Sequence, residues 1–190
     1  MIVVCGSLEP TWRNDGPAFA ISARAVTAGA SVQVIGIVPD GADGDRILIG
    51  LATAGIGHAA ILRTAPRPLE QADVELALRY LPDVRVVIAV GATEPLLSSL
   101  ADGAAFSGAT LVVVSGPENE AAAPNLPESA IVLEAPADDP DETFAGFVGA
   151  FAARLDRSEK PADAWDATLR ELAVDAVTPA PGRRDRKAAP

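Results

Sequence analysis

The chain has 190 residues, of which 49% are hydrophobic, and this is enough for one globular domain with a sizeable core. The net charge of −11 argues against nucleic acid as a partner, and no apolar run reaches the length of a membrane span. The single cysteine, Cys5, excludes an internal disulfide and a cysteine-based zinc site, and the single histidine, His58, argues against histidine-based catalysis. We therefore expect a cytoplasmic protein that binds neither nucleic acid nor a membrane.

The charge is unevenly distributed along the chain. After Val177, four basic residues against one aspartate give a net +3, so the rest of the chain carries −14. The segment 178–190 is rich in proline, alanine and arginine, a composition typical of disorder. The sequence therefore predicts an ordered domain over residues 1–177 and a disordered basic tail over residues 178–190.

Strands and helices alternate along the ordered region. Short apolar runs predict strands, and apolar residues three and four positions apart predict helices. The segment 84–90, which is apolar and mostly β-branched apart from Arg85, is typical of a central strand buried on both faces. In chain order we expect strand 2–5, helix 17–28, strand 32–38, helix 47–54, strand 59–62, helix 74–81, strand 84–90, helix 96–100, strand 111–114, strand 130–133, helix 144–155 and helix 162–174.

This alternation predicts a three-layer α/β/α domain with a mostly parallel sheet and right-handed crossovers. In such sheets ligands bind beyond the carboxyl ends of the strands. Here those ends are followed by Gly6-Ser7, Pro39-Asp40, residues 91–94, Ser115-Gly116 and the turn 138–142.

The helix over 144–155 carries an apolar stripe along one face, which predicts burial of that face. Its members are Phe144, Phe147, Val148, Phe151 and Leu155, and they include three of the chain's five phenylalanines. The other expected inward-facing side chains of this part of the molecule belong to the last helix and are Trp165, Leu169 and Leu172.

The turn that precedes this helix is acidic and has two interpretations. Its carboxylates are those of Asp138, Asp139, Asp141 and Glu142. Acidic residues commonly cap the first turn of a helix. The free N–H groups and the dipole at a helix start also attract anions, so one of these carboxylates could instead be a catalytic group beside a phosphate site.

Three other polar positions have local interpretations. Thr93 follows the central strand and is expected to cap the next helix, and Ser158 is expected to cap the last helix. Asp40, Asp43 and Asp45 lie close together and indicate either a solvated turn or a cation site.

The stretch 135–155 resembles the C-terminal motif of the ribokinase-like (PfkB) carbohydrate kinases, D-T-x-G-A-G-D-x-F. In that family the glycines and the backbone of the turn form an anion hole, and the aspartate is the general base that takes a proton from the sugar hydroxyl. Matching Glu142-Thr143-Phe144 to D-T-F places Asp139, Pro140 and Asp141 on G-A-G, whereas a second alignment places Ala145 at the base position. In both alignments the two glycines and the aspartate are replaced.

Other motifs resemble the same family in the same order. Residues 29–44 resemble its L-G-A-x-V-x-x-I-G-x-V-G-x-D-x-x-G pattern, and residues 15–20 stand where its sugar-binding G-G-x-G-x-N motif lies. The segments 8–15 and 64–68 are too short for the strands of the family's lid, and only residues 116–129 stand in place of its nucleotide section. The resemblance therefore implies a ribokinase-like core without the β lid.

This resemblance implies two main functional hypotheses. We expect a protein that lacks kinase activity and whose fold is retained for binding or assembly. The alternative is an active ATP-dependent kinase for a sugar or nucleoside, with Glu142 as general base, and ATP and Mg²⁺ would be its cofactors. A third hypothesis is a nucleotide-binding regulatory module. The candidate substrate-binding or anion-binding residues are Gly16, Asp139, Asp141 and Thr143.

The expected partners are a small-molecule ligand and a second copy of the chain. Loss of the lid and nucleotide sections would leave apolar surface and sheet edges uncovered, and proteins usually cover both. A homodimer is the simplest cover.

Overall fold

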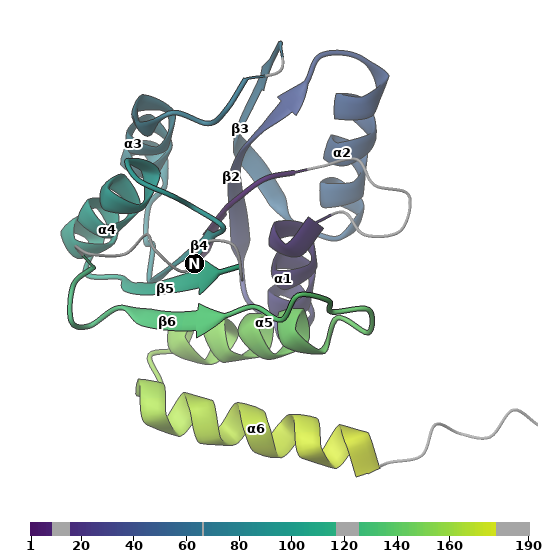
Figure 1. Ribbon diagram of the computed structural model, residues 1–190, viewed down its shortest axis with the longest axis vertical. Helices are drawn as coiled ribbons and strands as arrows, with labels where there is room; N and C mark the ends of the chain where they lie inside the picture. Colours follow the sequence, from purple (N-terminus) through teal and green to yellow (C-terminus); the bar gives the residue numbers. More distant parts are fainter. Residues whose placement is uncertain (9–15, 66, 117–125, 178–190) are drawn as a thin grey trace, which may run out of the picture.

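The computed structural model describes residues 1–8, 16–65, 67–116 and 126–177, with side chains up to residue 173 (Figure 1). Six parallel strands form one sheet in the order β3-β2-β1-β4-β5-β6. This confirms the predicted parallel sheet, and the order is doubly wound, with a switch in the direction of strand addition between β1 and β4. The strands are β1 (Ile2–Cys5), β2 (Val32–Pro39), β3 (Gly57–Thr64), β4 (Val86–Val90), β5 (Thr110–Ser115) and β6 (Ile131–Glu134).

Helices cover both faces of the sheet, which confirms the three-layer α/β/α architecture (Figure 1). Successive side chains of a strand point to opposite faces. Ile2 and Val4 of β1 therefore pack on the face covered by α1, α2 and α5, whereas Val3 and Cys5 pack on the face covered by α3 and α4. The helices are α1 (Gly16–Thr27), α2 (Ala42–Thr53), α3 (Gln71–Tyr80), α4 (Leu96–Ser107), α5 (Thr143–Asp156) and α6 (Pro161–Val177).

Helices α1 and α5 pack closely against one another. The predicted stripe on α5 is confirmed, because its last four members are buried and Phe144 is partly buried. Gly149 permits the close approach, since a Cβ at this position would lie 2.7 Å from both the Ala25 nitrogen and the Arg24 Cβ. This contact brings the start of α5 beside the start of α1.

Helix α6 lies against α5 and buries its small side chains there (Figure 1). Ala164 and Thr168 are fully buried, and Leu172 packs against the core. The prediction that Leu169 points inward was wrong, because it is 47% exposed and no further layer covers this side of α6 within the described residues. Trp165 is 37% exposed, but its ring packs inward in T-shaped contacts with two α5 phenylalanines, and its centroid lies 4.7 Å from that of Phe147.

Both predicted side-chain caps were wrong. Ser158 has a left-handed backbone with φ of 66° and its N–H donates to the Leu155 carbonyl, so it ends α5 rather than starting α6. Pro95 precedes α4, and Thr93 contributes only its carbonyl, which accepts a hydrogen bond of 3.1 Å from the Leu97 N–H.

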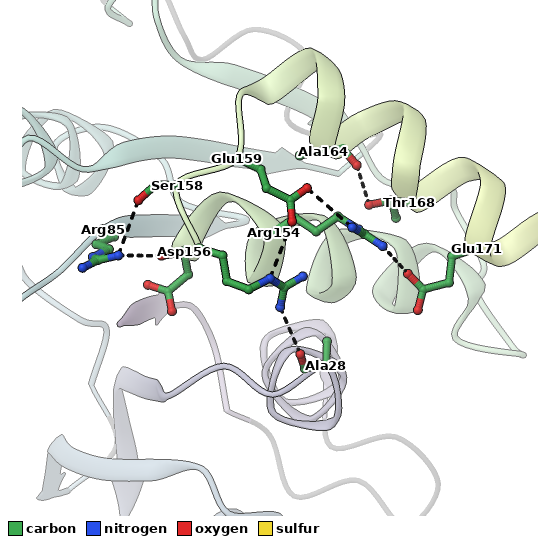
Figure 2. A network of polar contacts seen from close by, with 10 residues as sticks. Ala28, Arg85, Arg154, Asp156, Ser158, Glu159, Ala164, Thr168 and Glu171 are labelled. Carbon is green, nitrogen blue, oxygen red and sulfur yellow. Dashed lines mark hydrogen bonds and ion pairs between the residues drawn. The ribbon is translucent and has the colours of Figure 1, made fainter.

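Charged side chains fix the connection between α5 and α6 (Figure 2). Arg154 donates to Glu159 at 3.5 Å and to Glu171 at 2.8 Å, which ties α6 back to α5. Arg85, which precedes β4, donates to the Asp156 carbonyl at 3.1 Å. These bonds anchor the helix pair to the amino-terminal end of the sheet.

Every strand in the described part of the chain belongs to this one sheet, so those residues contain no lid strands. Residues 9–15 and 117–125, which the sequence assigns to loops, lie outside the described residues, as does the predicted tail 178–190. Among the helices described, none combines the length and the apolar character that a bilayer crossing requires.

Candidate functional site

Two cavities lie at the carboxyl ends of the strands, the edge at which ligands bind in open α/β sheets. The turn cavity, of about 310 Å³, lies between the start of α1 and the segment that joins β6 to α5. The switch-point cavity, of about 420 Å³, lies where β1 and β4 end. Both volumes are in the range of small-molecule sites.

Asp139 lines the turn cavity and caps α5. Its Oδ1 accepts a hydrogen bond of 3.1 Å from the Phe144 N–H, and its Oδ2 accepts one of 3.0 Å from the Ala145 N–H. The residue directly before α5, Glu142, makes no side-chain cap. A carboxylate of the chain itself therefore occupies the N–H groups that an anion would use at this helix start.

Glu142 also lines the turn cavity, but its carboxylate is engaged by α1. Its Oε2 lies 2.9 Å from Arg24 Nη2, and the backbone of Glu142 is left-handed with φ of 53°. Such a backbone is uncommon for a residue with a Cβ. The turn is closed by a 3.0 Å hydrogen bond from the Glu142 N–H to the Asp139 carbonyl.

The structure brings together three of the five candidate residues. Gly16, Asp139 and Glu142 all line the turn cavity, although Gly16 comes from α1 and the two acids come from the turn before α5. Asp141 and Thr143 are exposed and do not line it. Their proposed roles in binding stay predictions.

The switch-point cavity is formed by strand ends that the sequence already indicated. Gly6, Ser7, Pro39, Gly91 and Ala92 line it. Gly6 is needed for close packing, because a Cβ there would lie 2.9 Å from that of Ala18 and 3.1 Å from that of Val90. The missing side chain thus lets α1 and β4 approach the end of β1.

Arg67 lines the same cavity and was missed in the sequence. Its Nη1 lies 2.6 Å from Asp73 Oδ2 and its Nη2 lies 2.9 Å from Asp73 Oδ1, so the pair is bidentate. The hydrogen bonds from Arg67 hold the pKa of Asp73 below its ordinary value. Asp73 also joins Glu70 in the capping box of α3. The sequence did contain a signal for this ion pair, because Arg67 lies three residues before Glu70 and six before Asp73.

The described residues do not form a metal site. In them no cluster of three or more His, Cys, Asp or Glu residues could hold a metal ion. Asp40 and Asp45 pair with Arg63, and Asp43 pairs with Arg46, which agrees with the solvated-turn interpretation.

Cys5 is a buried apolar residue, as the sequence predicts. It is 1% exposed, and burial raises the pKa of its thiol to about 12. The thiolate is the reactive form of cysteine, so this residue is not a nucleophile at neutral pH.

No family model and no curated protein matches the chain. Among solved structures, it is similar to Sa239 with 14% identity and a TM-score of 0.66, over 98% of this chain and 97% of that one. A protein assigned as ribokinase II from E. coli, solved with ATP and Mg²⁺, gives 11% identity and a TM-score of 0.64 over 95% and 94% of the two chains. Aminoimidazole riboside kinase from Salmonella enterica gives 13% identity and a TM-score of 0.58 over 94% of each.

These similarities establish the fold, because they extend over nearly the whole chain. The sequence identities are too low to assign a function. The chain has a ribokinase-like fold, as its motifs indicated.

Proposed function

We propose that this chain is a ribokinase-like protein that does not transfer phosphoryl groups to sugars and that uses its fold to bind a small molecule. The observation that carries the proposal is the position of Asp139, whose carboxylate accepts hydrogen bonds from the first N–H groups of α5.

The resemblance places the anion hole of the kinases at this helix start. Phosphoryl transfer depends mainly on positioning and on neutralising charge around the phosphates. At this helix start the Asp139 carboxylate occupies the N–H donors, and it would repel an incoming phosphate. The residues present at this helix start therefore do not fit the triphosphate of ATP.

The candidate general base supports the same conclusion. A base must face the hydroxyl from which it takes the proton. The carboxylate of Glu142 is instead held by Arg24 at 2.9 Å, and a glutamate places its carboxylate about one methylene farther out than an aspartate. A misplacement near 1 Å can cost on the order of a hundredfold in rate.

The switch-point cavity is the proposed binding site. Its lining is mainly apolar and includes Leu8, Ile37 and Leu69, with Arg67 as its charged side chain. Asp73 fixes the guanidinium and leaves part of its five-donor fork for a ligand. We expect a small ligand with an apolar body and an oxygen acceptor that faces Arg67.

One observation favours the alternative, an active sugar or nucleoside kinase. Glu142 does line the turn cavity, together with Gly16 from α1, so a carboxylate is present in a space that could hold a substrate. If this alternative holds, ATP and Mg²⁺ are its cofactors.

The deciding experiment measures ATP turnover with Mg²⁺ against a panel of pentoses, hexoses and nucleosides. We expect no turnover above background. Turnover that disappears in Glu142→Gln and persists in Glu128→Gln, a matched change at an exposed turn, would establish the active kinase instead. A rise in melting temperature with ATP but without turnover would favour the nucleotide-binding regulatory module.

The binding site is tested separately by a thermal-shift screen of small carboxylates and phosphate esters. We expect a stabilising ligand whose effect is lost in Arg67→Gln and kept in Arg79→Gln, a change on the surface of α3. Equal loss in both variants, or no stabilising ligand at all, would count against the switch-point cavity.

A further inference from the structure

Strand β6 ends the sheet, and its outer edge has no partner strand within the described residues. It pairs only with β5. The Ala135 N–H donates to the Ser115 carbonyl at 2.8 Å, so in a parallel ladder Ile131 and Leu133 also direct their backbone groups toward β5. The N–H and C=O groups of Val132 and Glu134 therefore point outward.

Apolar side chains gather along this outward edge. Val132 is 54% exposed, and Trp165 and Leu169 of α6 are also among the exposed large hydrophobic residues. A groove of about 400 Å³ runs between β6 and α6, with Phe144 and Phe147 in its lining. We call the groove and the outward backbone groups of β6 together the β6 edge.

The opposite edge of the sheet is protected and the β6 edge is not. Natural proteins guard edge strands with charged side chains, bulges or a covering element. Strand β3 carries His58 and Arg63, and its pairing with β2 is irregular between Gln33 and Ile35. Strand β6, I-V-L-E, has Glu134 as its one charged residue and contains no proline, and its register with β5 is regular, so its edge is less guarded than that of β3.

We propose that the β6 edge is covered by the β6 edge of a second copy of the chain, so that two sheets join in one continuous sheet. A two-fold axis places the two β6 strands antiparallel. Pairing Val132 with the partner's Glu134 uses both outward residues of each copy and forms four backbone hydrogen bonds. The register that places Glu134 opposite the partner's Glu134 is disfavoured by like charge.

Charge and shape also favour a second copy. Glu134 is the one charged side chain that lines the groove, so the acidity of the chain is not concentrated there. Arg170 follows Leu169 on α6, and its one described hydrogen bond goes to the Asp166 carbonyl of its own helix. Arg170 is exposed, and we expect it to lie near the partner's Glu134 in this arrangement. The same axis brings the two α6 helices together, so their Trp165 and Leu169 side chains cover the seam.

Sedimentation of the full chain over a dilution series tests this proposal. We expect a monomer–dimer equilibrium in which Val132→Glu raises the dissociation constant by about tenfold or more, because the new carboxylate would face the partner's Glu134 across the seam. Ile49→Glu is the control, since Ile49 is a branched apolar residue that is 66% exposed on α2, and it should leave the constant unchanged. If Val132→Glu does not fold, Leu169→Glu is the second variant.

Amide hydrogen exchange tests whether the β6 edge is the surface that forms the dimer. The amides of Val132 and Glu134 should be protected at high concentration and exchange faster on dilution, whereas those of Ile131 and Leu133 should not change. A monomer at about 100 µM, a dimer insensitive to both variants, or a dimer whose Val132 and Glu134 amides exchange freely would overturn the proposal. This result is independent of the ATP-turnover assay.

Discussion

At the scale of single residues, Asp139 has the largest consequence. It is the one acidic residue of the turn whose side chain bonds to the N–H groups at the start of α5 in the described contacts. The same carboxylate stabilises the helix and closes its anion site. Helix stability and phosphate binding are therefore expected to oppose one another here.

Replacing Asp139 with alanine should separate these two effects. We expect Asp139→Ala to lower the free energy of unfolding by about 1 kcal/mol, as for the loss of a helix cap, and the melting temperature by about 2–4 °C. We also expect sulfate to raise the melting temperature of this variant more than that of the unmodified chain, because the Phe144 and Ala145 N–H groups become free. Asp138→Ala, an exposed neighbour, should do neither. Equal sulfate effects in all three proteins would contradict this assignment.

The bidentate pair of Arg67 and Asp73 should show in the pH dependence of stability. The pKa of Asp73 is lower in the folded chain than its ordinary value, so its contribution is complete above the unfolded pKa of about 3.9. It is lost as the pH falls through the lower folded value. Chemical denaturation should show Asp73→Asn less stable by on the order of 1 kcal/mol at pH 7, with the difference shrinking below about pH 4. A difference that is constant down to pH 2, or one that Asp102→Asn reproduces, would exclude this ion pair as the cause.

Single residues were also the hardest to predict from sequence. Thr93 and Ser158 have the residue types of caps, but the positions of Pro95 and the left-handed turn after α5 decide the geometry. Arg67 was missed because its spacing to Glu70 and Asp73 indicates only an ion pair, whereas its place in the cavity depends on the segment 67–69 lying beside the ends of β1 and β4.

At the scale of elements, the contact between α1 and α5 positions the turn cavity. It places Arg24 against Glu142 and brings Gly16 opposite Asp139. The close approach depends on Gly149, because a Cβ there would lie only 2.8 Å from the Ile21 carbonyl oxygen of α1. A larger residue there must push the helices apart.

Two glycines on α5 provide a matched test of this packing. Gly149→Ala should destabilise the chain by on the order of 1–3 kcal/mol, because its Cβ overlaps the α1 backbone. Gly146→Ala should be neutral or stabilising by up to about 1 kcal/mol, since nothing lies within 4 Å of its Cβ position and alanine favours a helix. Equilibrium denaturation measures both. Similar effects of the two substitutions would show that α1 and α5 are not packed this closely.

The helices and strands were well predicted, because the local sequence patterns agree with the fold. A continuous apolar run such as 86–90 is satisfied by burial on both faces of the sheet, and glycines such as Gly29 and Gly55 follow helices with positive φ. The ends of the observed elements differ from the predicted ends by a few residues. Helix α4 continues to Ser107, beyond its predicted end at residue 100, although its last turns have little apolar pattern. The outward face of α6 was mispredicted because periodicity identifies an apolar stripe but not the element that covers it.

At the scale of the whole molecule, the chain has a ribokinase-like fold. The fold is similar to those of solved ribokinase-like kinases over nearly the whole chain. The residues at the start of α5 depart from the kinase motif that this stretch resembles. We infer that burial preserves the sheet and its helices, whereas the loops at its carboxyl edge set the function.

The most direct test of this account is an NMR titration of the Phe144 and Ala145 amides with ATP and Mg²⁺. We predict no saturable shift in the unmodified chain up to about 5 mM nucleotide, a concentration that would reveal even millimolar affinity, because the Asp139 carboxylate holds both amides. Asp139→Ala serves as the responsive control, in which both amides become available to phosphate. A saturable shift of these two amides in the unmodified chain would show that phosphate displaces Asp139, and would contradict the account.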